Sequence, residues 1–190
     1  MILAVELLKA ALVLLGCAQI PAQAQSARVS RPGQIILIRH AEKPVDPADP
    51  HLSRAGVERA RQLVSFIKTD PAMRRFGSPV AVFATQTTKD DNGQRTQETV
   101  APLAAALGLA VQTPYHGKEF AALATRILST PAYAGKTVVI CWNHEEIPQL
   151  AAALGVPPPP KWKGSVFDMV YVITYRHGSA ALSTSRYGNR

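Results

Sequence analysis

The sequence predicts a single α/β domain, a three-layer α/β/α sandwich with a mostly parallel central sheet. Three runs of apolar, often β-branched residues are typical of buried strands, at 35–38, 80–84 and 137–141. Each is followed by a segment with helical signals, at about 53–68, 95–107 and 148–154. Alternation of strands and helices favours a sheet whose two faces are both covered by helices.

Local signals support the helices. Ser53 can cap the first helix, whose apolar positions are Val57, Ala60, Leu63, Val64 and Ile67. The second helix is expected to end at Gly108, and the last to begin near Pro148, a residue favoured in the first helical turn. A further helix is expected at about 119–129.

The C-terminal part predicts two more strands. Residues 166–175 read as a strand, and 180–187 are expected to pair with it at the edge of the sheet. Four consecutive prolines at 157–160 predict a stiff surface connection that precedes these two strands. The length of 190 residues is enough for one domain with a sizeable core.

The first 25 residues read as an export signal. Residues 10–16 form an apolar run too short to cross a bilayer, and Ala22-Gln23-Ala24 matches the small-x-small cleavage pattern. Two alternatives stay open: Leu-Leu-Gly-Cys at 14–17 is similar to a lipoprotein box with Cys17 as the lipid anchor, or the segment is a buried helix. We expect a signal at 1–25, a domain at 26–190, a periplasmic or secreted location, and a membrane partner only if Cys17 is lipidated.

Charge and cysteine content restrict the partners. The formal charge of +8 favours anionic partners, and it stays at +8 when residues 1–25 are removed. The basic residues are scattered, so no nucleic-acid partner is expected. Cys141 ends an apolar strand and is expected to pack in the core, so we expect no structural disulfide.

Basic side chains stand at three places that the fold would bring together. Arg39 and His40 follow the first strand, His144 follows the third, and Arg95 opens the helix after the second. The carboxyl ends of parallel strands meet at one edge of a sheet, where α/β proteins usually bind ligands. An arginine at a helix N-terminus opposes the helix dipole unless an anion lies there, so this edge predicts an anion site.

These segments carry a resemblance to a known family. Arg39-His40-Ala41 after a strand, Arg95-Thr96-x-x-Thr99 at a helix start and a strand ending before His144 resemble the histidine phosphatase, or phosphoglycerate mutase-like, superfamily. Ala41 replaces the usual glycine, and the loop at 85–94 is longer than usual. The resemblance implies the phosphoglycerate mutase-like fold in a small exported member.

The resemblance also implies a function, the hydrolysis of phosphomonoesters through a phosphohistidine on His40. Arg39 and Arg95 would bind the non-bridging phosphoryl oxygens, and His144 would donate to the same group. No metal or cofactor is expected. The expected partners are a small phosphorylated substrate or phosphate, with a phosphoprotein as a further option. The alternatives are a non-catalytic phosphoryl-binding module and a mutase-type phosphotransfer.

Two assignments leave alternatives. Lys43 is expected to contact the phosphate as a point charge, or else to be a solvent-exposed loop lysine. We favour Glu145 as the acid that protonates the leaving group, because it adjoins His144; Glu119 and Glu42 are the alternatives. The short chain between Arg95 and His144 leaves little room for a lid. It therefore predicts an open pocket, with preferences set by the loops 44–51 and 113–118.

Overall fold

A computed structural model describes residues 31–89 and 93–188 of the chain. The predicted signal at 1–25 and Cys17 lie outside these residues. Within the described ranges, no helix is long and apolar enough to cross a membrane.

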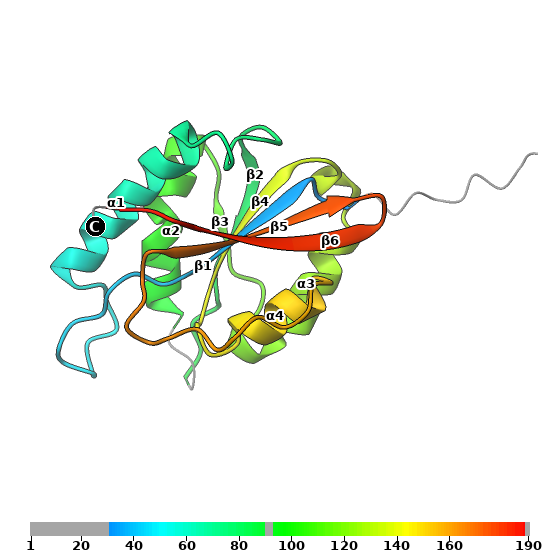
Figure 1. Cartoon of the computed structure of the whole chain (residues 1–190). Coiled ribbons are helices and arrows are strands. Elements are labelled where there is room, and N and C mark those ends of the chain that lie inside the picture. The colour runs from blue at the N-terminus through cyan, green and yellow to red at the C-terminus, as the bar shows by residue number, and fades with distance from the viewer. Residues whose placement is uncertain (1–30, 90–92, 189–190) are drawn as a thin grey trace, which may run out of the picture.

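One mixed sheet of six strands forms the centre of the domain, in the order β3-β2-β4-β1-β5-β6 (Figure 1). The strands are β1 (Gln34–Arg39), β2 (Pro79–Phe83), β3 (Val111–Gln112), β4 (Thr137–Trp142), β5 (Met169–Arg176) and β6 (Ser179–Arg186). The first four are mutually parallel, and β5 and β6 form an antiparallel hairpin beside β1. The predicted strands are therefore all present, and the short strand β3 is one that the sequence did not signal.

Helices cover the two faces of the sheet in pairs. The helices are α1 (Arg54–Thr69), α2 (Gln94–Leu107), α3 (Phe120–Ser129) and α4 (Ile147–Ala153), with short 3-10 turns at Gly117–Glu119 and Pro131–Tyr133. Helices α1 and α2 lie on one face, and α3 and α4 lie on the other (Figure 1). This arrangement is the predicted three-layer sandwich.

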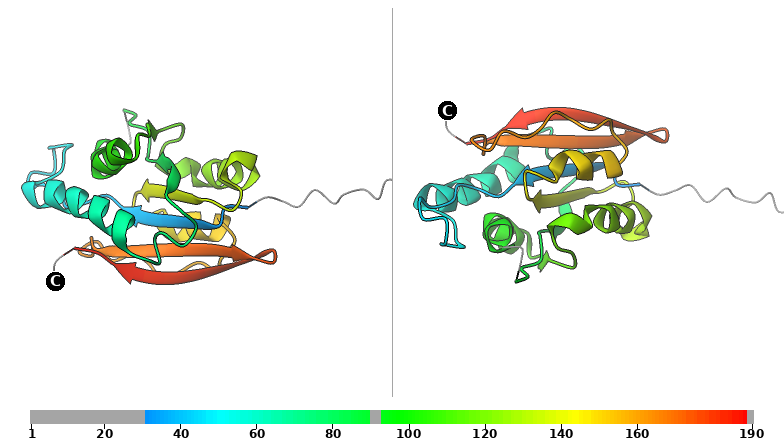
Figure 2. Two further views of the ribbon diagram at one scale, coloured as in Figure 1. Left: turned by 90° about the horizontal axis from the view of Figure 1, so that it is seen from above. Right: turned by 90° about the horizontal axis from the view of Figure 1, so that it is seen from below.

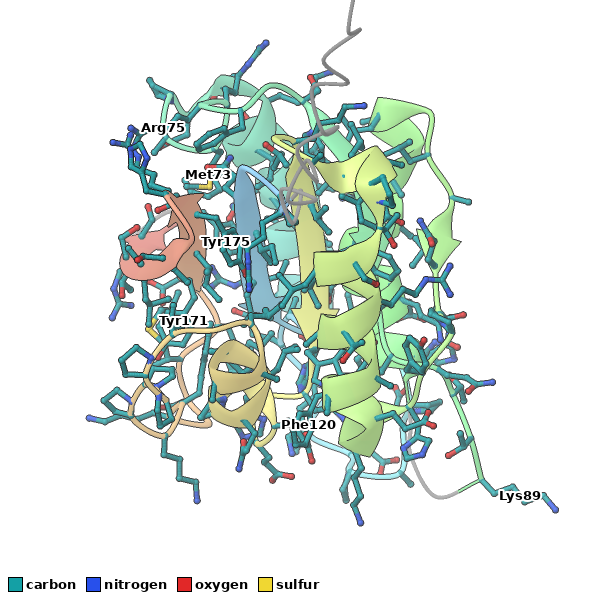
Figure 3. All side chains as sticks on the ribbon, turned by 90° about the vertical axis from the view of Figure 1, so that its right-hand side faces the viewer. Met73, Arg75, Lys89, Phe120, Tyr171 and Tyr175 are labelled. Carbon is teal, nitrogen blue, oxygen red and sulfur yellow. The ribbon has the colours of Figure 1, made fainter. Side chains whose placement is uncertain are left out.

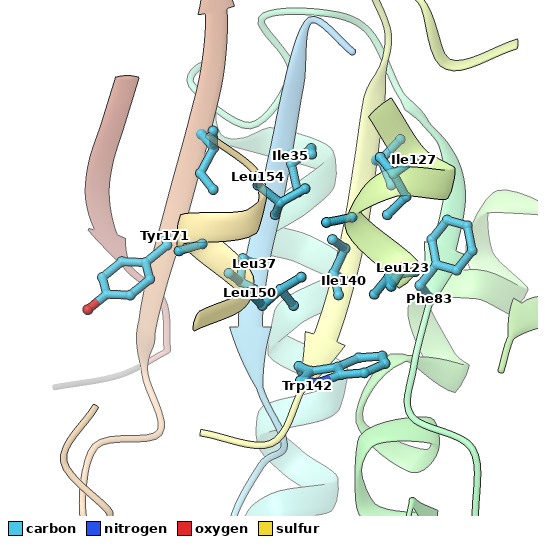
Figure 4. Close-up of a cluster of buried hydrophobic side chains, with 14 of the residues drawn as sticks. Ile35, Leu37, Phe83, Leu123, Ile127, Ile140, Trp142, Leu150, Leu154 and Tyr171 are labelled. Atoms are coloured by element: carbon cyan, nitrogen blue, oxygen red, sulfur yellow. The ribbon is translucent and has the colours of Figure 1, made fainter. Parts of the chain in front are cut away.

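Alternate residues of the central strands supply both cores. Leu37 and Ile140 point toward Leu123 of α3 and Leu150 of α4 (Figure 4). Their neighbours along β1 and β4 point the other way, and this second core contains Ile36, Val139 and Cys141. Every residue of β1 and β4 is buried, as the continuous apolar runs predict. Cys141 is a free, buried cysteine, as expected.

Helix α1 differs from its prediction at one position. Ser53 caps it by accepting a hydrogen bond from the Gly56 amide, as expected. Val57, however, is 41% exposed, so it does not belong to the buried face. The buried position in this turn is Gly56, where an added Cβ would lie 2.3 Å from the carbonyl oxygen of Glu42. The first turn of α1 is thus packed against the loop that follows β1, and only a glycine allows this approach.

The parallel register brings the strand ends together. Arg39 at the end of β1 is the direct neighbour of Trp142 at the end of β4. The turn of the β5–β6 hairpin and the start of β1 lie at the other end of the sheet (Figure 2). The sheet therefore has two different ends, one where β1, β2 and β4 finish and one where they begin.

Candidate active site

A pocket of about 440 Å³ lies where β1 and β4 end. Its lining residues are Arg39, His40, Lys43, Arg95, Asn143, His144, Glu145 and Gly164. All residues predicted to act in catalysis or substrate binding are among them. Asn143 and Gly164 were not predicted.

His40 has one ring nitrogen fixed by the backbone. Its Nδ1 lies 2.7 Å from the carbonyl oxygen of Ala41. A carbonyl oxygen can only accept, so Nδ1 carries the hydrogen, and Nε2 of the neutral ring keeps its lone pair. Burial, with the charges of Arg39 and Arg95 as smaller causes, lowers the pKa of His40 to about 4. The ring is therefore neutral at pH 7.

Arg39 is buried and held by the segment before β5. Its Nη1 lies within hydrogen-bonding distance of three backbone carbonyl oxygens, those of Gly164 (2.7 Å), Val166 (3.3 Å) and Lys163 (3.4 Å). The ring of Phe167 covers the guanidinium, with 4.1 Å from Cζ to the ring centroid. Its Nη2 lies 3.4 Å from Nε2 of His40. Burial lowers the pKa of Arg39 to about 10, so the group is still charged at neutral pH.

Arg95 joins α2 to the loop after β1. Its Nε donates to the carbonyl oxygen of His51 at 3.2 Å, and its Nη2 donates to that of Asp49. These bonds hold the loop over the N-terminus of α2, and they do not use Nη1. Arg95 thus lines the pocket while it fixes one of the pocket's borders.

The two threonines of the Arg95-Thr96-x-x-Thr99 segment hold the strand ends in place. The Thr99 hydroxyl accepts from the Ala41 amide at 2.9 Å and donates to the Arg95 carbonyl. The Thr96 hydroxyl lies 2.6 Å from that of Thr85, just after β2. Both threonines are fully buried. The start of α2 is therefore tied to β1 beside His40 and to β2.

His144 stands across the pocket from His40. The ring centroids are 6.3 Å apart and the rings are nearly perpendicular. Burial, followed by the charge of Arg39, lowers the pKa of His144. A Cβ added at Gly164 would lie 3.6 Å from Nε2 of His144, so the glycine keeps this side of the pocket wide.

The three candidate acids have different surroundings. Glu145 lines the pocket. Glu42 forms an ion pair with Arg59, with 2.6 Å between Oε1 and Nη2. Glu119 accepts a hydrogen bond from the backbone amide of His116. Of the three, only Glu145 is therefore placed beside the histidines.

The segment 157–168 contributes more than the stiff connection predicted for its prolines. Trp162 anchors it in the core, where its ring packs 4.8 Å from that of Tyr171. Its Nε1 donates to the Val166 carbonyl at 2.8 Å, which closes a tight loop. This loop presents Gly164 to the pocket and the carbonyl oxygens to Arg39. By contrast, no residue of either predicted selectivity loop, 44–51 or 113–118, lines the pocket, contrary to the prediction; Lys43, just before the first of them, does.

No protein-family model matches the sequence, and no curated protein matches it. The structure aligns with mycobacterial glucosyl-3-phosphoglycerate phosphatase in complex with inorganic phosphate. The TM-score is 0.52 at 14% identity, over 80% of this chain and 95% of that one. The fold is phosphoglycerate mutase-like.

Two further structures align at lower TM-scores. A putative phosphohistidine phosphatase SixA from Nakamurella multipartitia has a TM-score of 0.47 at 16% identity, over 82% of this chain and 95% of that one. A mutant phosphoserine phosphatase from Entamoeba histolytica in complex with phosphoserine has a TM-score of 0.48 at 14% identity, over 79% and 94%. The fold assignment depends on the mycobacterial protein.

In this phosphoglycerate mutase-like domain, the site combines a neutral imidazole with fixed cations. Arg39 and Arg95 offer planar N–H donors, which match the oxygens of a phosphoryl group. Among the described residues, no group of three or more His, Cys, Asp or Glu side chains is placed to hold a metal ion. The chemistry available from these side chains is nucleophilic attack by an imidazole nitrogen on an anion that arginines hold.

Proposed function

We propose that this protein is a phosphatase that hydrolyses phosphomonoesters through a phosphohistidine on His40. The supporting observation is the hydrogen bond from Nδ1 of His40 to the Ala41 carbonyl, which leaves Nε2 of this pocket-lining residue without a proton, 3.4 Å from Nη2 of Arg39. An imidazole attacks phosphorus only when the attacking nitrogen carries no proton. The lowered pKa of His40 keeps the nitrogen in that form at neutral pH.

The cations have a binding and an electrostatic role. Arg39 and Arg95 bind the non-bridging oxygens of the phosphoryl group, and Lys43 adds a point charge at the border of the pocket. Charge on these oxygens is stabilised by donors that are already fixed before the substrate arrives. Arg39 is fixed by the carbonyl oxygens of segment 157–168, and Arg95 by those of the loop after β1. His144 donates one N–H to the same group.

The reaction has two steps. In the first, the Nε2 lone pair of His40 forms a P–N bond, the ester P–O bond breaks, and the leaving oxygen takes a proton from Glu145. In the second, water attacks the phosphohistidine, the P–N bond breaks, and Glu145 takes a proton from the water. Glu145 is thereby restored, and the sum is ester plus water giving alcohol plus phosphate.

A nucleophile variant tests the proposal. His40→Ala removes the attacking nitrogen, so we expect hydrolysis of p-nitrophenyl phosphate to fall by roughly a thousandfold or more. The matched control is His177→Asn, in the β5–β6 turn at the other end of the sheet. His177 has a φ of 49°, which asparagine tolerates well. Turnover by His40→Ala within tenfold of the unmodified protein would rule out His40 as the nucleophile.

The pocket itself bears on the substrate class. Its volume of about 440 Å³ leaves room for a small ester, and its lining includes Lys43 and Gly164. We therefore propose small phosphomonoesters as substrates, with selectivity set by Lys43 and by segment 157–168, which contributes Gly164 to the lining. A panel of phosphorylated metabolites, sugars and phosphopeptides, assayed with the unmodified protein and with His40→Ala, tests this. Strong preference for one bulky substrate, such as an inositol polyphosphate, would contradict it.

A further inference from the structure

We propose that the end of the molecule opposite the pocket is a basic face that binds the surface of an anionic lipid bilayer. The basic face consists of Arg31, Lys68, Arg74, Arg75, Arg126, Lys136 and Arg176. These residues come from segments far apart in the sequence: the segment just before β1, the ends of α1, α3 and β5, and the turns before β2 and before β4. The topology places all these segments where the parallel strands begin.

The two ends of the sheet differ in their carboxylates. Among the described residues, the basic face contains one, Asp70, whose Oδ1 is occupied by the amides of Ala72 and Met73. At the pocket end the described carboxylates are Glu42, Asp46, Asp49, Glu98, Glu119, Glu145, Glu146 and Asp168. The basic charges of the pocket end are therefore largely balanced, and those of the basic face are not.

The charges of the basic face are available to a partner. Its residues are exposed except for Arg31, which is half-buried, and within the described ranges none of them pairs with a carboxylate. The Arg31 and Arg75 guanidinium groups lie over the rings of Tyr175 and Phe76, each 5.7 Å from the ring centroid. Arg75 stands at the opposite end of the molecule from Lys89 (Figure 3).

A shallow pocket of about 240 Å³ lies within this face. Its lining includes Arg31, Phe76, Tyr175, Arg176 and His177. It has room for one phosphate-sized group beside two arginines, whereas the other cations are spread around it. Such a spread of positive charge matches an extended anionic surface, and the pocket matches a single headgroup phosphate on that surface.

The sequence before Arg31 favours a bilayer over nucleic acid as the extended surface. The chain enters the domain at the basic face, and Cys17, the lipid anchor if the lipoprotein box is used, stands 14 residues before Arg31. Basic residues close to a lipid anchor are attracted by anionic lipid headgroups. Contact through this face would leave the catalytic pocket, at the other end, open to solution. The proposal does not depend on the proposed phosphatase activity.

Vesicle co-sedimentation of the full chain tests the proposal. The charge-reversal variant Arg75→Glu/Lys136→Glu/Arg176→Glu changes three exposed residues of the basic face. We expect the unmodified chain to bind phosphatidylglycerol vesicles better than phosphatidylcholine vesicles at about 0.1 M salt. We expect the reversal variant to bind the anionic vesicles at least about tenfold more weakly.

The matched control is Arg54→Glu/Arg61→Glu/Lys89→Glu, which changes the net charge equally at exposed residues outside the basic face. The control should bind the anionic vesicles within about twofold of the unmodified chain. Equal binding by the reversal variant and the control would overturn the proposal, as would equal binding of the unmodified chain to the two lipids. Tighter binding of the unmodified chain to duplex DNA than to anionic vesicles, lost in the reversal variant, would also overturn it, since the face would then be a nucleic-acid surface.

Discussion

His40 owes its chemical state to its immediate surroundings. The Ala41 carbonyl selects the tautomer with hydrogen on Nδ1, and burial disfavours the charged ring. Ala41 in turn is held by the Thr99 hydroxyl through its backbone amide. The Arg-Thr-x-x-Thr segment thus reaches the residue next to His40 through a backbone hydrogen bond.

The protonation state of His40 can be measured directly. In an NMR titration of the imidazole resonances, His40 should titrate with a midpoint near pH 4. His51, which is hydrogen-bonded to Glu98, should titrate above 6.5 and serves as an internal reference. Between pH 6.5 and about 4 the unfolded chain binds a proton at His40 and the folded chain does not, so this group lowers stability as the pH falls. A His40 midpoint at 6.5 or above would contradict the assigned environment.

Glu145 is the acid that the pocket geometry favours. Glu145→Gln should lower the hydrolysis of an alkyl phosphate by roughly a hundredfold, because an alkoxide leaves poorly without a proton. Hydrolysis of p-nitrophenyl phosphate should fall much less, because nitrophenolate needs no proton to leave. Glu119→Gln is the matched control and should leave both rates close to those of the unmodified protein. If Glu119→Gln gave the larger loss with the alkyl ester, the assignment would move to Glu119.

At the residue scale, the sequence allowed prediction of the charged side chains in the pocket and of its histidines, but not of Asn143 or of the pocket's backbone. The predicted side chains stand at or shortly after strand ends or at a helix start, and parallel strands bring such positions together. These residues are Arg39, His40, Lys43, Arg95, His144 and Glu145. Gly164 was missed because it contributes a carbonyl oxygen and the absence of a side chain. Neither a backbone carbonyl nor a missing side chain can be recognised from the sequence of a segment that has no regular pattern.

At the scale of elements, the first turn of α1 and the loop after β1 depend on each other. Helix propensity alone predicts that Gly56→Ala stabilises the protein by about 1 kcal/mol. The structure predicts the opposite sign, a loss of roughly 1–3 kcal/mol, because the new Cβ would meet the Glu42 carbonyl. Urea unfolding measures the change, with the exposed Glu58→Ala in the next turn as the control. If Gly56→Ala were more stable than the unmodified protein, the loop after β1 would have moved away from the new Cβ at little cost, contrary to this prediction.

The elements that the sequence predicted are those with long, regular patterns. The buried strands β1, β2 and β4 and the helices that follow them occur close to their expected bounds. Strand β3 has two residues, Val111 and Gln112, which is too short for any periodicity to be visible. Val57 was wrongly predicted to be buried. An apolar pattern shows which residues could be buried, but here the close approach of the Glu42 backbone to Gly56 turns Gly56 inward and leaves Val57 exposed.

At the scale of the whole molecule, the grouping of basic residues on one face could not be predicted from the sequence. The residues of the basic face are scattered from Arg31 to Arg176, so the sequence showed only an excess of positive charge. Folding brings them together, because each connection from a helix to the next parallel strand lies at the end of the sheet where these strands begin. The export signal at 1–25, lipidation of Cys17 and the periplasmic or secreted location stay predictions.

Chemical identification of the reaction intermediate is the sharpest test of the proposed phosphohistidine at residue 40. The unmodified protein is mixed with ³²P-labelled phosphodonor, denatured in alkali within milliseconds and digested, and the labelled peptide is sequenced by mass spectrometry. We expect a label on His40 that is stable in alkali and lost in acid, and that is absent from His40→Ala. A label on another residue, or full turnover with no labelled peptide at any time, would contradict it.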